Sequence, residues 1–158
     1  MKVTKEKLLD MYRTMFMIRS FELKAAELFA AGRIPGFVHL YMGEEAVATG
    51  VCANLKESDY ITSTHRGHGH LLAKGGDVNL MMAEVFGKAS GYCKGKGGSM
   101  HIADVNLGIL GANGIVGAGF PIAVGAAFSC KYRKTGDVVV CFFGDAASNW
   151  GTDRRAHV

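Results

Sequence analysis

The feature that most limits how this chain can fold is an unbroken apolar run at Val138–Phe143, which ends at Gly144 and Asp145. Apolar residues without alternation are typical of a parallel strand covered on both faces, whereas a strand with one solvent-exposed face alternates apolar and polar residues. We therefore expect an α/β fold in which helices flank a parallel sheet. In open sheets of this kind ligands bind beyond the carboxyl ends of the strands. Asp145 and the Asn149 amide are thus candidate oxygen ligands for a divalent cation.

The rest of the chain alternates helical and extended patterns. Residues 4–32 predict one long helix that Thr4 caps and Gly32 ends. Shorter helices are expected at 43–55, 79–86 and 121–133, a strand at 60–64, and a long loop at 87–119. With no repeat or linker, residues 1–158 form one α/β unit. The long helix owes its apolar stripe to residues spaced mainly three or four apart: Leu8, Met11, Tyr12, Met15, Ile18, Ala25 and Leu28.

Composition excludes several classes of protein. The net charge of +4 is weak and scattered, which argues against a nucleic-acid partner. Four cysteines without a C-x-x-C pair favour reduced thiols and a cytoplasmic location. The chain has neither a signal-peptide core nor an 18-residue apolar stretch, so no membrane partner is expected. The 22 glycines occur in clusters, which suggests loops that approach a ligand closely.

The run of residues 65–70 (HRGHGH), directly after the predicted strand, has three interpretations. His68 and His70 could both face one side of an extended loop and bind zinc. The histidines could instead be solvated or bonded within the structure. The third interpretation is an anion or substrate site in which Arg66 donates to a phosphate.

Two glycine-rich loops are weaker signals. Residues 94–99 (KGKGGS) lack the spacing of a P-loop and could be only a flexible basic loop. Residues 114–121 (GIVGAGFP) contain a Gly-x-Gly, but Ile122 stands where a dinucleotide fingerprint needs its third glycine. Backbone amides of the second loop could still meet a ligand at the start of the helix that follows.

Five motifs in order give a more specific signal than any one of them: residues 36–46 (GFVHLYMGEEA), 65–70, 95–101 (GKGGSMH), 111–117 (GANGIVG) and 144–145 (GD). Together they resemble the alpha subunit of the thiamine-diphosphate-dependent first component of 2-oxo acid and acetoin dehydrogenase complexes. The resemblance covers residues 4–152, and residues 39–46 and 60–66 are most similar to the acetoin-cleaving branch. It implies a thiamine-diphosphate-binding fold, truncated at the C-terminus.

The resemblance also implies a role for each matching residue. His39 would be the catalytic acid–base or substrate-orienting group, and Asp145 would bind Mg²⁺. His65 and Arg66 would hold the diphosphate of thiamine diphosphate. Further backbone contacts to the cofactor would come from Gly114, Val116, Ala146 and Ala147.

The implied partners are a beta subunit, in an assembly of two alpha and two beta chains, and a lipoyl acyltransferase. The implied activity is cleavage of acetoin with transfer of the two-carbon unit to lipoamide. Its rivals are a pyruvate or branched-chain 2-oxo acid dehydrogenase alpha subunit, a non-catalytic partner-binding fragment and, more distantly, a zinc hydrolase.

The chain departs from the family pattern near its end. Ala146 stands where the family has glycine, and an alanine there would be strained if the backbone were left-handed. Trp150 and residues 153–158 also differ from the pattern. We therefore expect an amino-terminal fragment with an altered tail, which is inactive alone and binds thiamine diphosphate weakly or not at all.

Overall fold

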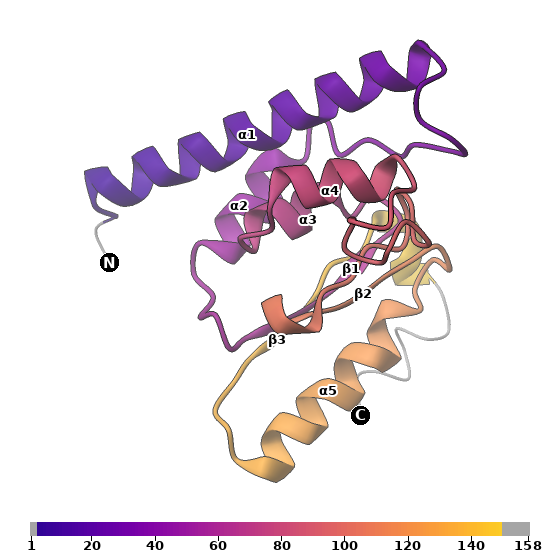
Figure 1. Cartoon of the computed structure of the whole chain (residues 1–158). Helices are drawn as coiled ribbons and strands as arrows, with labels where there is room; N and C mark the ends of the chain where they lie inside the picture. The colour runs from indigo at the N-terminus through magenta and orange to yellow at the C-terminus, as the bar shows by residue number, and fades with distance from the viewer. Residues whose placement is uncertain (1–2, 150–158) are drawn as a thin grey trace.

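A three-stranded parallel sheet forms the centre of the protein (Figure 1). The structure is a computed structural model that describes residues 3–149. The strands are β1 (Tyr60–Thr64), β2 (Ile109–Asn113) and β3 (Val139–Cys141), in the spatial order β2-β1-β3. Ile61 of β1 is the partner of Ile109 on one side and of Val140 on the other. The predicted strand at 60–64 is therefore confirmed, and the parallel sheet with it.

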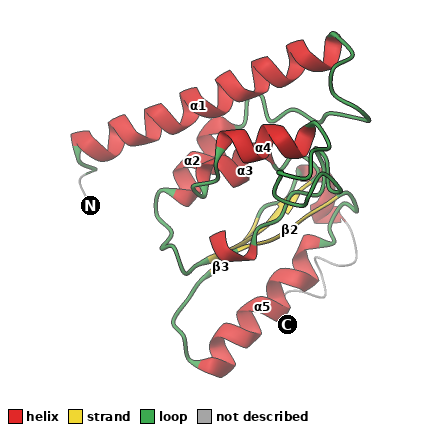
Figure 2. Ribbon diagram, viewed as in Figure 1, coloured by secondary structure: helices red, strands yellow, loops and turns green. Residues whose placement is uncertain are grey.

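Helices lie on both faces of this sheet, as the α/β prediction requires (Figure 2). Four gather on one side: α1 (Lys5–Ala30), α2 (Glu45–Cys52), α3 (His68–Ala73) and α4 (Val78–Val85). Helix α5 (Gly119–Arg133) packs on the opposite face and contacts all three strands. No helix in residues 3–149 is both long and apolar enough to cross a membrane.

The long helix α1 is confirmed, with the Thr4 hydroxyl accepting the Lys7 N–H at 3.2 Å as its N-cap. Its buried side chains are those of Ile18, Phe21, Glu22 and Ala25. Two residues of the predicted apolar stripe do not belong to the buried face: Leu8 is 55% exposed and Tyr12 is 62% exposed. In this part of α1 (Figure 1) the side chains of Lys7, Met11 and Thr14 face Thr49 and Ala53, so Leu8 and Tyr12 are left on the exposed side of the helix.

Three elements between β1 and α5 were not expected from the sequence: α3, β2 and a short 3-10 helix. The predicted loop at 87–119 contains β2 and a short 3-10 helix, η1 (Val105–Leu107). Residues 109–113 (ILGAN) include only one β-branched residue, and it is the parallel pairing with β1 that makes them a strand. Residues 68–73 form α3 rather than continuing the extended segment, because the helix buries His68, His70 and two leucines together.

The predicted strand at 138–143 is shorter and less buried than its composition indicates. Only Val139–Cys141 pair with β1, and all three are half-buried. Val138 and Phe143 at its ends are 54% and 53% exposed. Because these side chains are half-buried, the expected full burial of this strand on both faces is wrong in residues 3–149.

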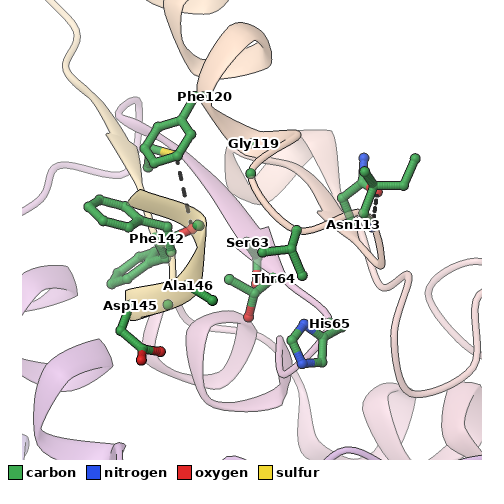
Figure 3. A pocket seen from close by; sticks show the side chains of 16 residues that line it. Ser63, Thr64, His65, Asn113, Gly119, Phe120, Phe142, Asp145 and Ala146 are labelled. Atoms are coloured by element: carbon green, nitrogen blue, oxygen red, sulfur yellow. Dashed lines mark hydrogen bonds between the residues drawn. The ribbon is translucent and has the colours of Figure 1, made fainter. Parts of the chain in front are cut away.

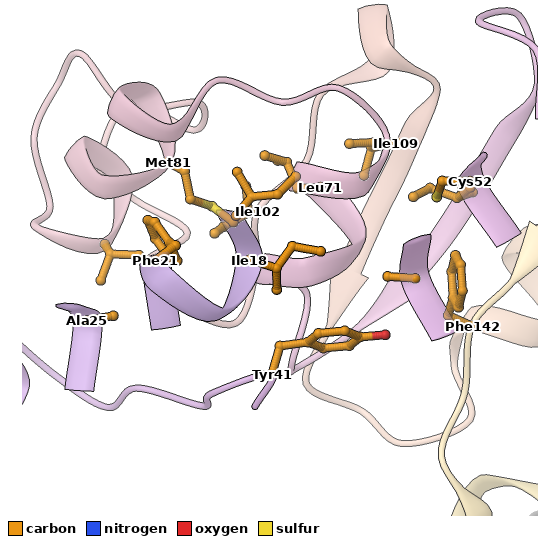
Figure 4. Close-up of a cluster of buried hydrophobic side chains, with 14 of the residues drawn as sticks. Ile18, Phe21, Ala25, Tyr41, Cys52, Leu71, Met81, Ile102, Ile109 and Phe142 are labelled. Atoms are coloured by element: carbon orange, nitrogen blue, oxygen red, sulfur yellow. The ribbon is translucent and has the colours of Figure 1, made fainter. Parts of the chain in front are cut away.

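The hydrophobic core lies between the sheet and helices α1–α4 (Figure 4). Gly69 allows α3 to approach the aromatic ring of Tyr41, because any Cβ at position 69 would overlap that ring. The ring of His70 lies between Tyr41 and Phe142, with centroid distances of 4.7 and 4.0 Å. The four cysteines (Cys52, Cys93, Cys130 and Cys141) are free thiols in the described chain.

Candidate functional site

Two adjoining clefts open at the carboxyl edge of the sheet, where the parallel strands end. The first is lined by the ends of β1 and β2 and by the segment after β3. Figure 3 shows Asp145 and Ala146 on one side of it, facing Ser63 and Thr64 at the end of β1 and His65 directly after it. The second cleft shares part of that lining and also includes Arg66 and Glu44. Both clefts thus lie where the fold class places ligands.

Arg66 and Asp145 line the same cleft, as the diphosphate hypothesis requires. Arg66 follows β1, and its Nη1 donates to the carbonyl oxygen of Leu40 at 2.7 Å. That bond occupies one of the five N–H donors of the guanidinium. Asp145 is exposed and opens the 3-10 helix η2 (Asp145–Asn149) after β3. A cation and a carboxylate therefore face one space at the end of the sheet.

His39 and His65 form an edge-to-face pair beside these clefts, with ring centroids 5.3 Å apart. The Nδ1 atom of His39 is buried and has no hydrogen-bond partner within residues 3–149. Burial is the main reason that the pKa of His65 lies below its usual value, and the nearby His39 and Arg66 lower it further. Both effects favour the uncharged form of His65, and Nδ1 of His39 is left for a bound group to satisfy.

The four backbone-contact residues fall into two groups. Val116, Ala146 and Ala147 line the first cleft. Gly114 is not among its lining residues, and it lies instead against the imidazole ring of His101. Ala146 is not strained, since Lys94 and Lys134 are the non-glycine residues with positive φ in the described chain. The departure from glycine at position 146 is thus accommodated without a left-handed backbone.

His68 and His70 serve the interior of the protein and not a zinc ion. Nδ1 of His68 lies 2.9 Å from the carboxylate of Glu22, and Nδ1 of His70 lies 2.7 Å from the hydroxyl of Ser63. Both histidines are on α3 and buried, so the extended loop that the zinc interpretation needed does not exist. Residues 3–149 contain no group of three potential ligands that could hold a metal alone.

Sequence analysis missed several residues that line the site. Ser63 and Thr64 are the last residues of β1 and line the first cleft. Asn113 is the last residue of β2, and its carboxamide oxygen accepts the Ile115 N–H at 2.9 Å. Phe142 and Phe143 supply the apolar wall. Asn113 could have been found only with β2, while Ser63 and Thr64 carry a usable signal: they are polar residues where a predicted strand ends.

Comparison with known proteins decides the family. Residues 13–154 match the family model described as "Dehydrogenase E1 component". The chain belongs to the dehydrogenase E1 component family. Members of this family use thiamine diphosphate, and the fold seen here agrees with a thiamine-diphosphate-binding domain.

Two similar E1 component relatives are alpha subunits of acetoin:2,6-dichlorophenolindophenol oxidoreductase. The one from Bacillus subtilis (strain 168) is 65% identical over 96% of this chain and 46% of its own length. The one from Cupriavidus necator is 56% identical over 94% of this chain and 44% of its own length. The pyruvate dehydrogenase E1 component subunit alpha of Zymomonas mobilis is 47% identical, over 97% of this chain and 44% of its own length. The chain thus spans less than half the length of these curated relatives.

The residues of this E1 component site suit thiamine diphosphate and Mg²⁺. Arg66 offers a planar cation to a diphosphate, and Asp145 in the same cleft offers one hard oxygen ligand. Mg²⁺ is commonly held by one or two carboxylates together with substrate phosphates, so the lack of a larger ligand cluster in residues 3–149 is compatible with it. Val116 and Phe142 add an apolar lining that suits an aromatic ring.

Proposed function

We propose that these residues form part of the alpha subunit of a thiamine-diphosphate-dependent acetoin dehydrogenase, which cleaves acetoin and passes the two-carbon unit to lipoamide. The cleft shared by Arg66 and Asp145 carries the proposal. An arginine would pair with phosphate oxygens, and a carboxylate would hold the Mg²⁺ that accompanies a diphosphate. The identities of 65% and 56% to two acetoin oxidoreductase alpha subunits, against 47% to a pyruvate dehydrogenase alpha subunit, favour acetoin as substrate.

Each site residue has a distinct task in this proposal. The carbanion chemistry that breaks a C–C bond beside a carbonyl comes from thiamine diphosphate when it is bound. Arg66 and His65 hold the diphosphate, and Asp145 holds Mg²⁺. His39 holds or moves a proton at Nδ1, the buried ring atom that has no partner in the described chain. Phe142, on the apolar wall, helps to exclude water from the reacting atoms.

Backbone contacts complete the binding of the cofactor. Val116, Ala146 and Ala147 line the cleft in which it would lie. Gly114 adjoins that segment, and its proposed contact is made through the backbone. We propose a beta subunit as partner, in an assembly of two alpha and two beta chains, because the relatives are themselves named as alpha subunits. A lipoyl acyltransferase would then receive the two-carbon unit.

The test is a substrate comparison with a full-length subunit that carries these residues, co-expressed with its beta subunit. Reduction of 2,6-dichlorophenolindophenol is followed with acetoin, pyruvate or a branched-chain 2-oxo acid as donor, with and without thiamine diphosphate and Mg²⁺. We expect cofactor-dependent activity with acetoin at least about tenfold above that with either oxo acid. A preference for pyruvate would contradict the acetoin assignment, and binding to the beta subunit without activity would support a non-catalytic role.

Residues 1–158 alone should be inactive and should bind thiamine diphosphate weakly or not at all. Glu44 and Asp145 are the carboxylate residues that line the cleft in the described chain, and residues 3–149 contain no group of three potential metal ligands, so the remaining contacts must come from elsewhere. Titration calorimetry of the 158-residue chain with thiamine diphosphate and Mg²⁺ measures this directly. Micromolar or tighter binding would contradict the expectation, and the complex with the beta subunit is the positive control.

A further inference from the structure

A buried chain of hydrogen bonds connects helix α1 to the segment that carries His39. The carboxylate of Glu22 lies 2.9 and 3.1 Å from Nδ1 of His68. Nε2 of His68 lies 2.9 Å from the hydroxyl oxygen of Ser99. That hydroxyl oxygen accepts the backbone N–H of His39 at 3.0 Å. Glu22 and His68 are fully buried and Ser99 is 5% exposed, so water does not compete for these bonds.

One arrangement of hydrogens gives every polar atom in this chain a partner. A carboxylate can only accept, so Nδ1 of His68 carries the hydrogen that Glu22 receives. In that arrangement the Ser99 hydroxyl donates to Nε2 of His68. One lone pair of the Ser99 oxygen remains for the His39 N–H. Each polar atom in the chain has its partner, which holds the Ser99 hydroxyl in a single orientation.

A second buried carboxylate fixes the backbone around Ser99. Glu84 on α4 is fully buried and accepts four backbone N–H groups at 2.7–3.1 Å, those of Cys93, Gly95, Gly97 and Gly98. Gly95 has φ +77°, and a Cβ there would overlap the backbone of Gly87. The loop before Ser99 is therefore tightly folded. Glu84 fixes the backbone that leads to Ser99, and His68 fixes the Ser99 side chain.

Ser99, His68 and Glu22 have the order of an acyl-transfer triad, but the geometry does not suit one. Ser99 is buried, and it lines neither cleft at the edge of the sheet. Its oxygen already accepts the His39 N–H, so attack on a substrate carbonyl would break that bond. The contact that the chain does make is with the backbone of His39, whose ring packs against that of His65 in the clefts.

We infer that Ser99, oriented by His68 and Glu22, is a positioning residue that holds His39 in place for the reaction. The inference rests on the proposed function, because that gives the His39 ring its role. Bonding of the His39 amide fixes the backbone from which the ring projects toward His65. Catalytic groups need placement to within a fraction of an ångström, and a buried bond to an immobile hydroxyl supplies it.

The test removes the hydroxyl and follows His39 both in the protein and in the reaction. The variants are Ser99→Ala, Ser99→Thr, which keeps the hydroxyl, and Ser90→Ala as a matched control in the exposed part of the same loop. Amide hydrogen exchange is measured by NMR at His39 in the 158-residue chain, and kcat and KM are measured in the full-length alpha–beta complex. If Ser99→Ala fails to fold, Ser99→Cys, of similar size but a weak acceptor, replaces it.

We expect Ser99→Ala to speed amide exchange at His39 at least about tenfold. We also expect it to lower kcat at least about tenfold while KM changes much less, since only the placement of His39 is disturbed. Ser99→Thr should recover most of both losses, and Ser90→Ala should match the parent protein. A purely structural role for Ser99 would lower the amount of folded enzyme without this separation of kcat from KM.

Two results would overturn the inference. One is unchanged exchange at His39 in Ser99→Ala, which would mean that the bond does not hold the amide. The other is an unchanged kcat in an active complex. If the parent complex shows no activity with any donor, the proposed function is wrong and the positioning role fails with it. The exchange rates would still show whether Ser99 holds the His39 backbone.

Discussion

Arg66 follows β1 and Asp145 follows β3, and the two side chains line one cleft although they are distant in the sequence. The parallel pairing of β1 with β3 brings this about, because it places the carboxyl ends of both strands at one edge of the sheet. Had the strands been antiparallel, the two residues would have lain at opposite ends. The pairing direction is therefore what makes a cation and a carboxylate available to one ligand.

Replacing Arg66 should weaken thiamine diphosphate binding in the full-length alpha–beta complex. Arg66→Ala removes a charge-assisted donor to the diphosphate, which corresponds to a loss of roughly 10- to 100-fold in affinity. Titration of the cofactor at saturating Mg²⁺ measures the change. Arg13→Ala is the matched control, because Arg13 is exposed on α1 and pairs only with Asp10 there. Equal cofactor affinities for Arg66→Ala and the parent complex would show that Arg66 does not bind the diphosphate.

Replacing Asp145 should change the requirement for Mg²⁺. Asp145→Asn keeps the size of the side chain but removes the charge that a hard divalent cation prefers. We expect the Mg²⁺ concentration for half-maximal activity to rise by about tenfold or more at fixed thiamine diphosphate. Asp10→Asn on the exposed face of α1 is the control. A normal Mg²⁺ curve for Asp145→Asn would show that Asp145 is not a metal ligand.

The carboxylate of Glu84 should be essential for the stability of the loop that precedes Ser99. Its two oxygens accept four buried N–H groups, and Glu84→Gln would turn one oxygen into an amino group that faces two of them. Each buried donor left without an acceptor costs about 1–3 kcal/mol, so a loss of about 3 kcal/mol in the free energy of unfolding is expected. Urea unfolding measures it, with Glu27→Gln on the exposed side of α1 as control. A loss below about 1 kcal/mol would contradict this account.

His70 should make the protein less stable as the pH falls below neutral. Burial lowers the pKa of His70 from 6.5 to about 3, so only the unfolded chain takes up its proton between these values. The free energy of unfolding should therefore fall by about 1.4 kcal/mol per pH unit below pH 6.5 through this residue.

The measurement is urea unfolding from pH 8 to pH 5, compared with His70→Asn, whose carboxamide can keep a bond to Ser63. At pH 5 the parent protein should have lost roughly 2 kcal/mol more than the variant, relative to pH 8. Between pH 8 and pH 7 the two slopes should agree, which serves as an internal control. Parallel curves down to pH 5 would mean that His70 is protonated in the folded state.

Much of the fold followed from local pattern. Thr4 as an N-cap, the strand at 60–64 and the helix at 121–133 were predicted because capping residues, β-branched runs and proline act within a few residues. Strand β2 and helix α3 were missed, since each depends on partners far along the chain. Met1, Lys2, Trp150 and residues 151–158, with the altered tail that they include, lie outside the described residues. The cytoplasmic location stays a prediction.

By itself, the sequence determined which residue types were available for chemistry and, through five ordered motifs, the family to which they belong. Only the tertiary structure decided how they are used. It placed Arg66 and Asp145 in one cleft. It also buried His68 and His70, which bond to protein groups instead of a metal: His70 contacts Ser63, and His68 contacts Glu22 and Ser99. The reason is physical: a motif specifies local backbone and chemistry, whereas burial and hydrogen-bond partners are settled by strand pairing and helix packing across the whole chain.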